Sequence, residues 1–353
     1  MVAGGWMPWA QAMDLALYHP DHGYYSKAPR RIGRGGDFYT AVSVGPLYGR
    51  LIAEQVARVW AAAGRPAHFV VAEQAAHDGQ LMEDLLMALQ TDHPEVARAV
   101  EVVLVEPQEG YQKAQEVRLK RVWAGRLRWV AQIADLEASA GFLVCNELLD
   151  AFAVHRVTKV NGQWMECGVA LSVDDSALVW EHRIIEDEGL NAEAARLLPD
   201  LPDGFVTEVP IAVTRWVAEL GRSGFWGTVW IADYGLDAED YWSLKRPEGT
   251  LRRYWEHRMD DRVLEDLGNA DLTCHVNFTV VHEAATAAGF WVTAYEDQGR
   301  FLTRLAAPWL RSLEGKVPKG EASGLLRQFQ SLTHPGIMGR SFRVMLLERV
   351  SGL

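Results

Sequence analysis

The chain has 353 residues, 49% of them hydrophobic and 23% charged, which is enough for two domains or for one domain with a large insertion. Its net charge of -12 argues against a nucleic-acid partner, because phosphate binding requires a concentrated basic surface. Its three cysteines form no CxxC pair, its N-terminus lacks the pattern of a signal peptide, and no run of roughly 18 apolar residues occurs, so we expect a cytoplasmic protein without disulfides, a cysteine zinc site or a membrane span.

Residues 1–67 are predicted to form a helical cap at the N-terminus. Apolar residues have helical spacing from 7 to 18, and this helix is expected to end before Pro20, because proline disfavours helical backbone in the residue that precedes it. A glycine-rich turn follows at 33–37, and apolar residues between 47 and 60 indicate a second helix.

The pattern changes at His68, where short apolar runs begin to alternate with segments of helical length. Nearly continuous apolar strands are expected when helices cover both faces of a parallel sheet. The chain is therefore predicted to be an α/β protein with a doubly wound sheet, its core divided between residues 68–150 and 226–353. The predicted strands are 68–73, 101–106, 127–130, 141–146 and 228–233.

The interval at 151–225, between the fourth and fifth predicted strands, is too long for an ordinary crossover. It contains Asn161-Gly162 between two strand-like runs, which is the strongest short-range signal of a hairpin. We therefore predict an inserted β-rich subdomain that ends in a helix near Trp216. Two helices, at 299–314 and 319–333, and a strand at 342–350 are predicted to complete the chain.

Polar residues follow the predicted strands, at the sheet edge where open α/β folds bind ligands. Glu106 closes the second strand, where a carboxylate can accept both ribose hydroxyls of NAD or of S-adenosylmethionine alike. Taken singly, each such residue also fits a strand that simply ends at the surface. The residues at these ends are Glu73, Glu106, Gln132, Asn146, Glu147 and Asp233 to Gly235.

The loop after the first predicted strand discriminates between ligands. Residues 73–79 lack both the GxGxxG dinucleotide pattern and the Lys-Ser/Thr of a P-loop, which disfavours phosphate binding. Gly79 begins a predicted helix whose positive N-terminal end suits a carboxylate, such as that of a methionine moiety.

Five segments stand out in order over nearly the whole chain: HPDHGYY at 19–25, GGDFYT at 35–40, NELLDAFAVH at 146–155, ADLTCHVNF at 270–278 and MGRSF at 338–342. Together they resemble the MidA family of methyltransferases, relatives of a mitochondrial complex I assembly factor that methylates arginine. The resemblance implies a seven-stranded class I methyltransferase fold, Rossmann-like, with an N-terminal helical cap and a β-rich insertion. It also implies S-adenosylmethionine as methyl donor and a protein substrate, an arginine of a respiratory-complex subunit or another protein.

One loop departs from the family pattern. Where the family reads Glu-Leu-Gly-Pro-Gly-Arg-Gly, this chain reads Glu-Gln-Ala-Ala-His-Asp-Gly at 73–79 and so lacks two of three glycines. Glycine serves there because the backbone turns tightly and approaches the ligand closely. His77 and Asp78 are candidates for polar contacts in a variant loop. The predicted cofactor-binding residues are Glu73, Ala75, Asp78, Gly79, Glu106, Gln132 and Asn146, with Gly36, Asp37 and Thr40 closing over the donor. Alternatively, Asp37 is an ordinary turn aspartate.

Glu147 and Asp150 are the predicted catalytic pair. Arginine has a pKa above about 12, so its methylation requires a group that orients the guanidinium and accepts a proton. Alternatively, Glu147 begins a loop and Asp150 caps a short helix. His155 and His275 are interpreted as structural or groove-lining, since no spacing of histidines, cysteines and carboxylates resembles a metal site.

Three functions are compatible with these patterns. The first is a protein methyltransferase, and the second is a catalytically silent assembly factor or peptide-binding module with a degenerate cofactor pocket. The third is a methyltransferase that acts on a small molecule. The family resemblance favours the first, and no metal or nucleic acid is expected in any of them.

Overall fold

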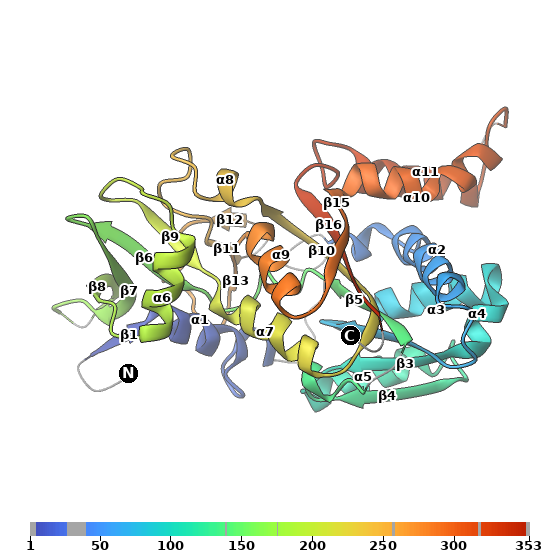
Figure 1. The fold of residues 1–353 in the computed structure, drawn as a ribbon, viewed down its shortest axis with the longest axis horizontal. Helices are drawn as coiled ribbons and strands as arrows, with labels where there is room; N and C mark the ends of the chain where they lie inside the picture. The colour runs from blue at the N-terminus through green and yellow to red at the C-terminus, as the bar shows by residue number, and fades with distance from the viewer. Residues whose placement is uncertain are drawn as a thin grey trace. The chain divides into compact units, whose positions relative to one another are not determined.

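The computed structural model describes residues 5–26, 40–137, 140–174, 176–255, 258–316 and 319–350 (Figure 1). The chain divides into two compact units, which alternate along the sequence. The sheet unit contains Pro29–Leu148, Ala218–Tyr234 and Ala285–Leu353, and the insertion unit contains Met1–Ala28, Leu149–Val217 and Gly235–Ala284. The predicted N-terminal segment 1–67 is thus shared between the units, and the predicted insertion at 151–225 falls mainly in the insertion unit.

The sheet unit is built on a doubly wound sheet in the order β15-β16-β10-β5-β2-β3-β4. β2 lies centrally and pairs in parallel with β3 on one side and with β5 on the other. β16 is antiparallel to both of its neighbours, β10 and β15. This order confirms the class I methyltransferase fold expected from the sequence. The strands are β2 (Phe69–Gln74), β3 (Val100–Val105), β4 (Arg126–Val130), β5 (Ala140–Asn146), β10 (Trp226–Leu236), β15 (Trp291–Asp297) and β16 (Phe342–Arg349).

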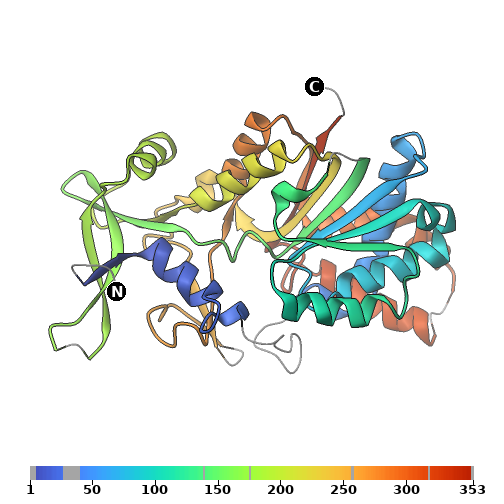
Figure 2. The same cartoon turned by 90° about the horizontal axis from the view of Figure 1, so that it is seen from below.

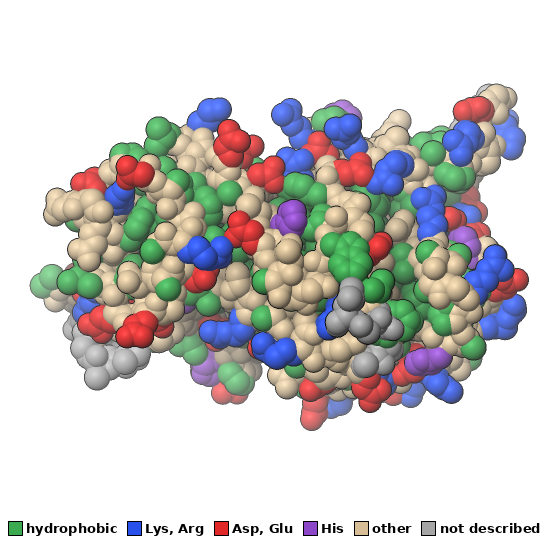
Figure 3. Space-filling view, in the orientation of Figure 1, with side chains coloured by type: hydrophobic (Ala, Val, Ile, Leu, Met, Phe, Trp, Pro, Cys, Tyr) green, Lys and Arg blue, Asp and Glu red, His purple; other side chains and the backbone are tan. Residues whose placement is uncertain are grey.

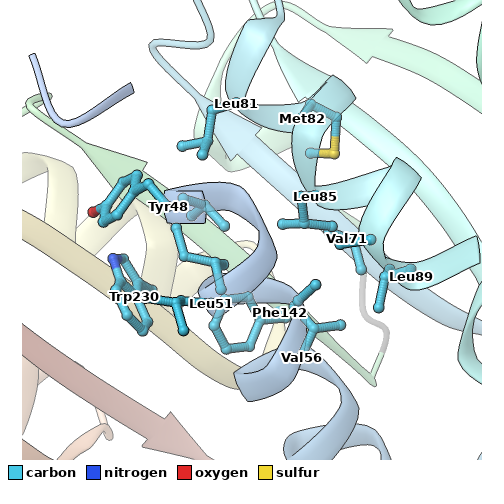
Figure 4. Close-up of a cluster of buried hydrophobic side chains, with 14 of the residues drawn as sticks. Tyr48, Leu51, Val56, Val71, Leu81, Met82, Leu85, Leu89, Phe142 and Trp230 are labelled. Atoms are coloured by element: carbon cyan, nitrogen blue, oxygen red, sulfur yellow. The ribbon is translucent and has the colours of Figure 1, made fainter. Parts of the chain in front are cut away.

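Helices of the sheet unit bury an apolar core against one face of the sheet. Figure 4 shows Tyr48 and Leu51 of α2 and Leu85 of α3 directed toward side chains of the sheet such as Phe142. The residues of β2 that point to the opposite face of the sheet are buried as well. Burial on both faces explains why β2 begins with a continuous apolar run. Figure 2 shows the strands side by side, with helices along them. The helices are α2 (Leu47–Ala62), α3 (Gln80–Asp92), α4 (Pro94–Ala99), α5 (Glu109–Leu119), α10 (Gln298–Ser312) and α11 (Glu321–Thr333).

The insertion unit contains a five-stranded sheet, in which β1, β7, β6 and β9 are neighbours in that order and β8 pairs with β7. Asn161 and Gly162 form the two-residue turn between β6 and β7, both with positive φ, so the predicted hairpin is confirmed. The strands of this sheet are β1 (Trp6–Pro8), β6 (His155–Val160), β7 (Gln163–Leu171), β8 (Leu178–Ile184) and β9 (Val206–Val209).

The rest of the insertion unit is made of short elements. The small sheet β12-β11-β13 is antiparallel throughout, and β14 (Val276–Asn277) pairs with the end of β10. Helix α7 (Ile211–Arg222) contains Trp216, as predicted, and leads from this unit into the sheet unit. The other elements are α1 (Trp9–Tyr18), α6 (Glu188–Leu197), α8 (Ala238–Tyr241), α9 (Phe278–Ala287), β11 (Arg252–Trp255), β12 (Arg258–Asp260) and β13 (Asp271–Thr273).

Charged side chains of both signs are interspersed on the face drawn in Figure 3. Within the described ranges, no helix combines the length and the apolar character needed to cross a membrane. The three cysteines, Cys145, Cys167 and Cys274, are all buried and free.

Candidate functional site

Three predicted site residues, Glu73, Glu106 and Asn146, lie at the ends of adjacent strands of the sheet unit. Gln74 of β2 is level with Val105 of β3 and with Cys145 of β5, the residues that precede Glu106 and Asn146. Because neighbouring strands are about 4.8 Å apart, the backbones of Glu106 and Asn146 are about 10 Å apart across the sheet. The carboxyl ends of these strands therefore share one edge, at the position where an open α/β sheet binds its ligand.

The loop between β2 and α3 has an unusual backbone. Ala75 and His77 have φ angles of 63° and 48°, and Gly79 has a φ of 85°. These are the three positions at which the family pattern has glycine. A left-handed conformation costs a non-glycine residue about 1 to 2 kcal/mol, and such strain is often retained at functional sites. The loop therefore keeps the backbone shape that glycine favours, although two of the glycines are absent.

Asp78 is engaged with other side chains of this loop and its neighbours. Its carboxylate pairs with Arg118, which also binds Glu83 at 2.6 Å, and His77 Nδ1 lies 3.7 Å from Asp78 Oδ1. Burial raises the pKa of Asp78, but the neighbouring His77 side chain and the charge and hydrogen bond of Arg118 outweigh this effect and lower the pKa to about 2. Asp78 is thus a charged anchor for the loop.

Glu106 is held in one orientation at the end of β3. Its Oε1 accepts a hydrogen bond of 2.9 Å from the backbone of Gln108, and its Oε2 accepts one of 3.4 Å from Gln115 Nε2. Burial raises the pKa of the Glu106 carboxyl, and these hydrogen bonds oppose that rise. A fixed carboxylate at this strand end is suited to accept hydrogen bonds from a diol.

Glu73 ends the apolar part of β2 and is only 3% exposed. Its Oε2 atom is buried and has no hydrogen-bond partner among the described residues. Burial, together with the negative charge of Asp78, raises the pKa of Glu73 to about 8, while the backbone amide of Met82 in the first turn of α3 lowers it. A buried carboxyl oxygen of this kind can accept a hydrogen bond from a ligand donor.

Glu147 follows β5 and also has a left-handed backbone, with a φ of 52°. Its Oε1 lies 3.1 Å from the Nδ2 of Asn146 and 3.4 Å from the backbone nitrogen of Ala41, both donors. The Asn146 amide is fixed in turn by Tyr48, whose hydroxyl donates to Oδ1 at 2.7 Å. The structure therefore assembles a buried tyrosine, an amide and a carboxylate in one chain of hydrogen bonds.

Asp150 belongs to the insertion unit and is buried there. Its backbone oxygen accepts a hydrogen bond of 2.9 Å from the amide of Cys274. The Tyr25 hydroxyl donates a hydrogen bond of 2.9 Å to Asp271. Burial raises the pKa of Tyr25, and the negative charges of Asp271 and Asp150 raise it further. No described helix begins at Asp150, so the structure does not support the alternative that it caps a short helix.

The remaining predicted site residues have other surroundings. Gln132 is exposed at the end of β4, the strand at the sheet edge, where it caps the 3-10 helix η3 (Ile133–Asp135). Thr40 is buried beside η2 (Val42–Val44) and accepts a hydrogen bond of 3.2 Å from the backbone nitrogen of Ser43. Gly36 and Asp37 lie outside the described residues.

The two histidines that the sequence marked as structural have protein surroundings. His155 pairs with Glu166 at 3.0 Å within the hairpin of β6 and β7. Burial and the charges of Arg246 and Arg252 lower the pKa of His275 to about 4. Among the described residues, no group of histidines, cysteines and carboxylates is placed to hold a metal ion.

These features fit S-adenosylmethionine. The molecule has a ribose diol, an amino group and a carboxylate, and the sheet edge offers the Glu106 carboxylate, the Glu73 carboxyl and the N-terminal end of α3 behind the left-handed loop. A doubly wound sheet with this strand order and these strand ends defines a class I methyltransferase.

The chain belongs to a family of S-adenosyl-L-methionine-dependent methyltransferases, whose model matches residues 51–295. It is therefore an S-adenosylmethionine-dependent methyltransferase, with S-adenosylmethionine as its cofactor. A crystal structure from Burkholderia thailandensis, bound to S-adenosyl-homocysteine, is similar with a TM-score of 0.83 and 28% identity, covering 98% of this chain and 89% of that one.

Curated relatives are similar over most of the chain. The Drosophila melanogaster protein arginine methyltransferase NDUFAF7 homolog is 25% identical, covering 98% of this chain and 82% of the relative. The human NDUFAF7 protein arginine methyltransferase is 25% identical over 78% of this chain and 65% of its own length. Both relatives are named as mitochondrial proteins, which contradicts the cytoplasmic location expected from the sequence.

Proposed function

We propose that this methyltransferase modifies a protein, with an arginine guanidinium as the methyl acceptor. The names of the curated relatives support this substrate class. A subunit of a respiratory complex is the candidate protein that the family resemblance implies. The observation that carries the chemistry is Glu147, whose strained backbone and hydrogen-bonded carboxylate stand at the end of β5.

In this proposal the strand ends of the sheet unit hold the cofactor. Glu106 accepts hydrogen bonds from the ribose hydroxyls, as acidic residues at this position do in nucleotide-binding folds. Glu73, Asn146 and the loop from Ala75 to Gly79 surround the methionine end, and the helix that follows Gly79 offers positive potential to its carboxylate. When bound, S-adenosylmethionine supplies an electrophilic methyl group on a sulfonium.

Glu147 acts on the guanidinium. Its carboxylate binds the N–H groups of the acceptor, which orients one nitrogen, and it accepts the proton that this nitrogen loses. Asn146 and Ala41 hold Oε1 through their hydrogen bonds and so fix the direction of the carboxylate.

Asp150 is the second carboxylate in this proposal. It is three residues along the chain from Glu147, so their Cα atoms are within about 11 Å of each other by covalent geometry alone. Its burial supports a role for a carboxylate that interacts strongly with a cation, because electrostatic interactions strengthen away from water.

Methyl transfer from isotopically labelled S-adenosylmethionine tests the proposal. The full chain is incubated with a protein extract freed of small molecules and, separately, with the small-molecule fraction, and labelled arginine is sought by peptide mass spectrometry. We expect label on protein arginine, and a loss of at least about a hundredfold in Glu147→Gln, the order of effect of removing a general base.

The matched measurement is binding of S-adenosylhomocysteine, which Glu147→Gln is expected to retain. Label only in the small-molecule fraction would contradict a protein substrate and identify a small-molecule methyltransferase. Full transfer by Glu147→Gln would contradict the role of Glu147.

A further inference from the structure

Helix α5 packs against the left-handed loop at 75–79. A Cβ atom built on Gly79 would lie 3.5 Å from the Cα of Gln115 and 3.6 Å from the Cγ of Leu119, so the helix approaches the loop to ordinary contact distance. Ala75 and His77, with φ angles of 63° and 48°, are held in conformations that their own side chains disfavour. Helix α5 is therefore in a position to stabilise this loop.

Gln115 joins this loop to the end of β3. Its buried Nε2 donates a hydrogen bond of 2.9 Å to the backbone oxygen of His77 and one of 3.4 Å to Glu106 Oε2. Trp129 donates to Gln115 Oε1 at 2.8 Å. Because an indole N–H is only a donor, this contact fixes which end of the amide faces the loop.

Arg118 is three residues further along α5, on the same side of the helix. Its Nε donates a hydrogen bond of 3.1 Å to the backbone oxygen of Asp78, and its guanidinium pairs with the carboxylates of Asp78 and Glu83. Gln115 and Arg118 therefore bind the carbonyl groups of two consecutive residues. Together they fix the peptide planes on both sides of Asp78.

We propose that Gln115 and Arg118 are positioning residues that hold the loop in its cofactor-binding shape and so keep His77 in the left-handed conformation that a glycine would adopt freely. This inference rests on the proposed placement of the cofactor at this loop. Without the two contacts, His77 would return to a common backbone conformation, and binding would have to impose the left-handed one again. A glycine at position 77 would remove most of that cost.

A double-mutant cycle tests this coupling, with S-adenosylhomocysteine as the probe in calorimetric titrations. We expect Arg118→Met to raise its Kd about tenfold and His77→Gly to change it less than about twofold. In the double variant, His77→Gly should recover at least half of the binding free energy that Arg118→Met loses, because the two changes act on one backbone segment. A loss of the same size with and without His77→Gly, or an unchanged Kd in Arg118→Met, would overturn the proposal.

Arg50 provides the matched control, since it is a partly exposed arginine of the same unit that pairs with Asp92 at 2.9 Å. Arg50→Met is expected to lower the melting temperature about as much as Arg118→Met does and to leave the Kd unchanged. An equal rise of the Kd in Arg50→Met would assign the effect to general destabilisation and overturn the positioning role.

Hydrogen exchange of the backbone amides at 75–79 gives a second measurement on the cofactor-free protein. We expect faster exchange in Arg118→Met and unchanged exchange in Arg50→Met. Unchanged exchange in Arg118→Met would overturn the clamping role even if the cofactor binds. A wild-type chain that fails to bind S-adenosylhomocysteine would instead contradict the placement of the cofactor, and the exchange rates would still decide whether α5 holds the loop.

Discussion

The hydroxyl of Tyr48 donates a hydrogen bond of 2.7 Å to Oδ1 of Asn146, across 98 residues of sequence. Tyr48 is fully buried, and burial raises the pKa of its hydroxyl, so it remains a neutral donor. Since Oδ1 is the acceptor of this bond, the Nδ2 group of Asn146 must face Glu147, to which it donates at 3.1 Å. A buried tyrosine of α2 thus sets the orientation of the proposed catalytic carboxylate.

Tyr48→Phe should reduce both stability and methyl transfer. The change removes one buried hydrogen bond and leaves the Asn146 amide free to rotate, so we expect the free energy of unfolding to fall by about 1 kcal/mol. The loss of the same free energy from the transition state, through a misoriented Glu147 carboxylate, lowers the rate of methyl transfer about fivefold. Urea unfolding and initial rates measure the two effects. A variant that loses stability and keeps the full rate would show that Tyr48 has no part in orienting Glu147.

Glu106→Ala should weaken binding of S-adenosylmethionine by about 1.5 to 3 kcal/mol, the usual cost of losing hydrogen bonds to a charged group. Calorimetry measures the change. Glu101→Ala is the matched control, because Glu101 lies on the same strand and pairs with His68 at 2.6 Å and with Arg128 at 2.7 Å. An unchanged dissociation constant in Glu106→Ala would place the ribose elsewhere, and an equal effect of Glu101→Ala would indicate a defect of the whole strand.

Glu73 should make stability depend on pH in the cofactor-free protein. Its pKa is raised from 4.5 to about 8, chiefly by burial, so between these values the folded state holds a proton that the unfolded state has lost. The stability that this raised pKa contributes is then fully present below the lower pKa. It is lost as the pH rises through the higher one, by up to about 1.4 kcal/mol per pH unit. Glu73→Gln keeps the shape and removes the titration, so its stability relative to wild type should increase from pH 5 to pH 8. Urea unfolding measures this difference. If the free energies of unfolding of Glu73→Gln and of wild type differ by a constant amount from pH 5 to pH 8, the raised pKa is contradicted.

Much of the sheet unit could be predicted because four of its strands contain nearly continuous apolar runs. β2, β3, β5 and β10 lie within a few residues of the predicted runs. β15 was not predicted, because this strand at the sheet edge carries half-exposed polar residues that interrupt its apolar pattern. The small sheet of β11, β12 and β13 was missed as well, since strands of 3 or 4 residues are too short to show a period.

The strand-end residues of the site could be predicted, and their supporting residues could not. Glu106 and Asn146 follow apolar runs directly, so the sequence itself marks the edge of the sheet. Gln115 lies in a helix with little apolar character and binds a carbonyl group 38 residues away. No local spacing connects such a residue to the loop, because its role depends on how α5 packs in three dimensions.

Ala75→Gly should stabilise the protein and change the affinity for the cofactor only slightly. Ala75 has a φ of 63°, which costs a non-glycine residue about 1 to 2 kcal/mol, and we expect the free protein to keep this loop shape and so to carry the strain before the cofactor binds. Glycine removes that strain and adds about 0.4 to 1 kcal/mol of conformational freedom to the unfolded chain. The expected net gain in the free energy of unfolding is therefore up to about 1.6 kcal/mol, with a change of less than about threefold in Kd.

Ala57→Gly is the matched control for Ala75→Gly. Ala57 lies within α2, where a glycine relieves no strain, so this variant should lose about 1 kcal/mol of stability. Opposite signs for the two substitutions in urea unfolding would demonstrate the left-handed backbone at position 75, and equal losses would contradict it. A tenfold tightening of S-adenosylhomocysteine binding in Ala75→Gly would instead show that the strain arises on binding, and so that the free loop is relaxed at this position.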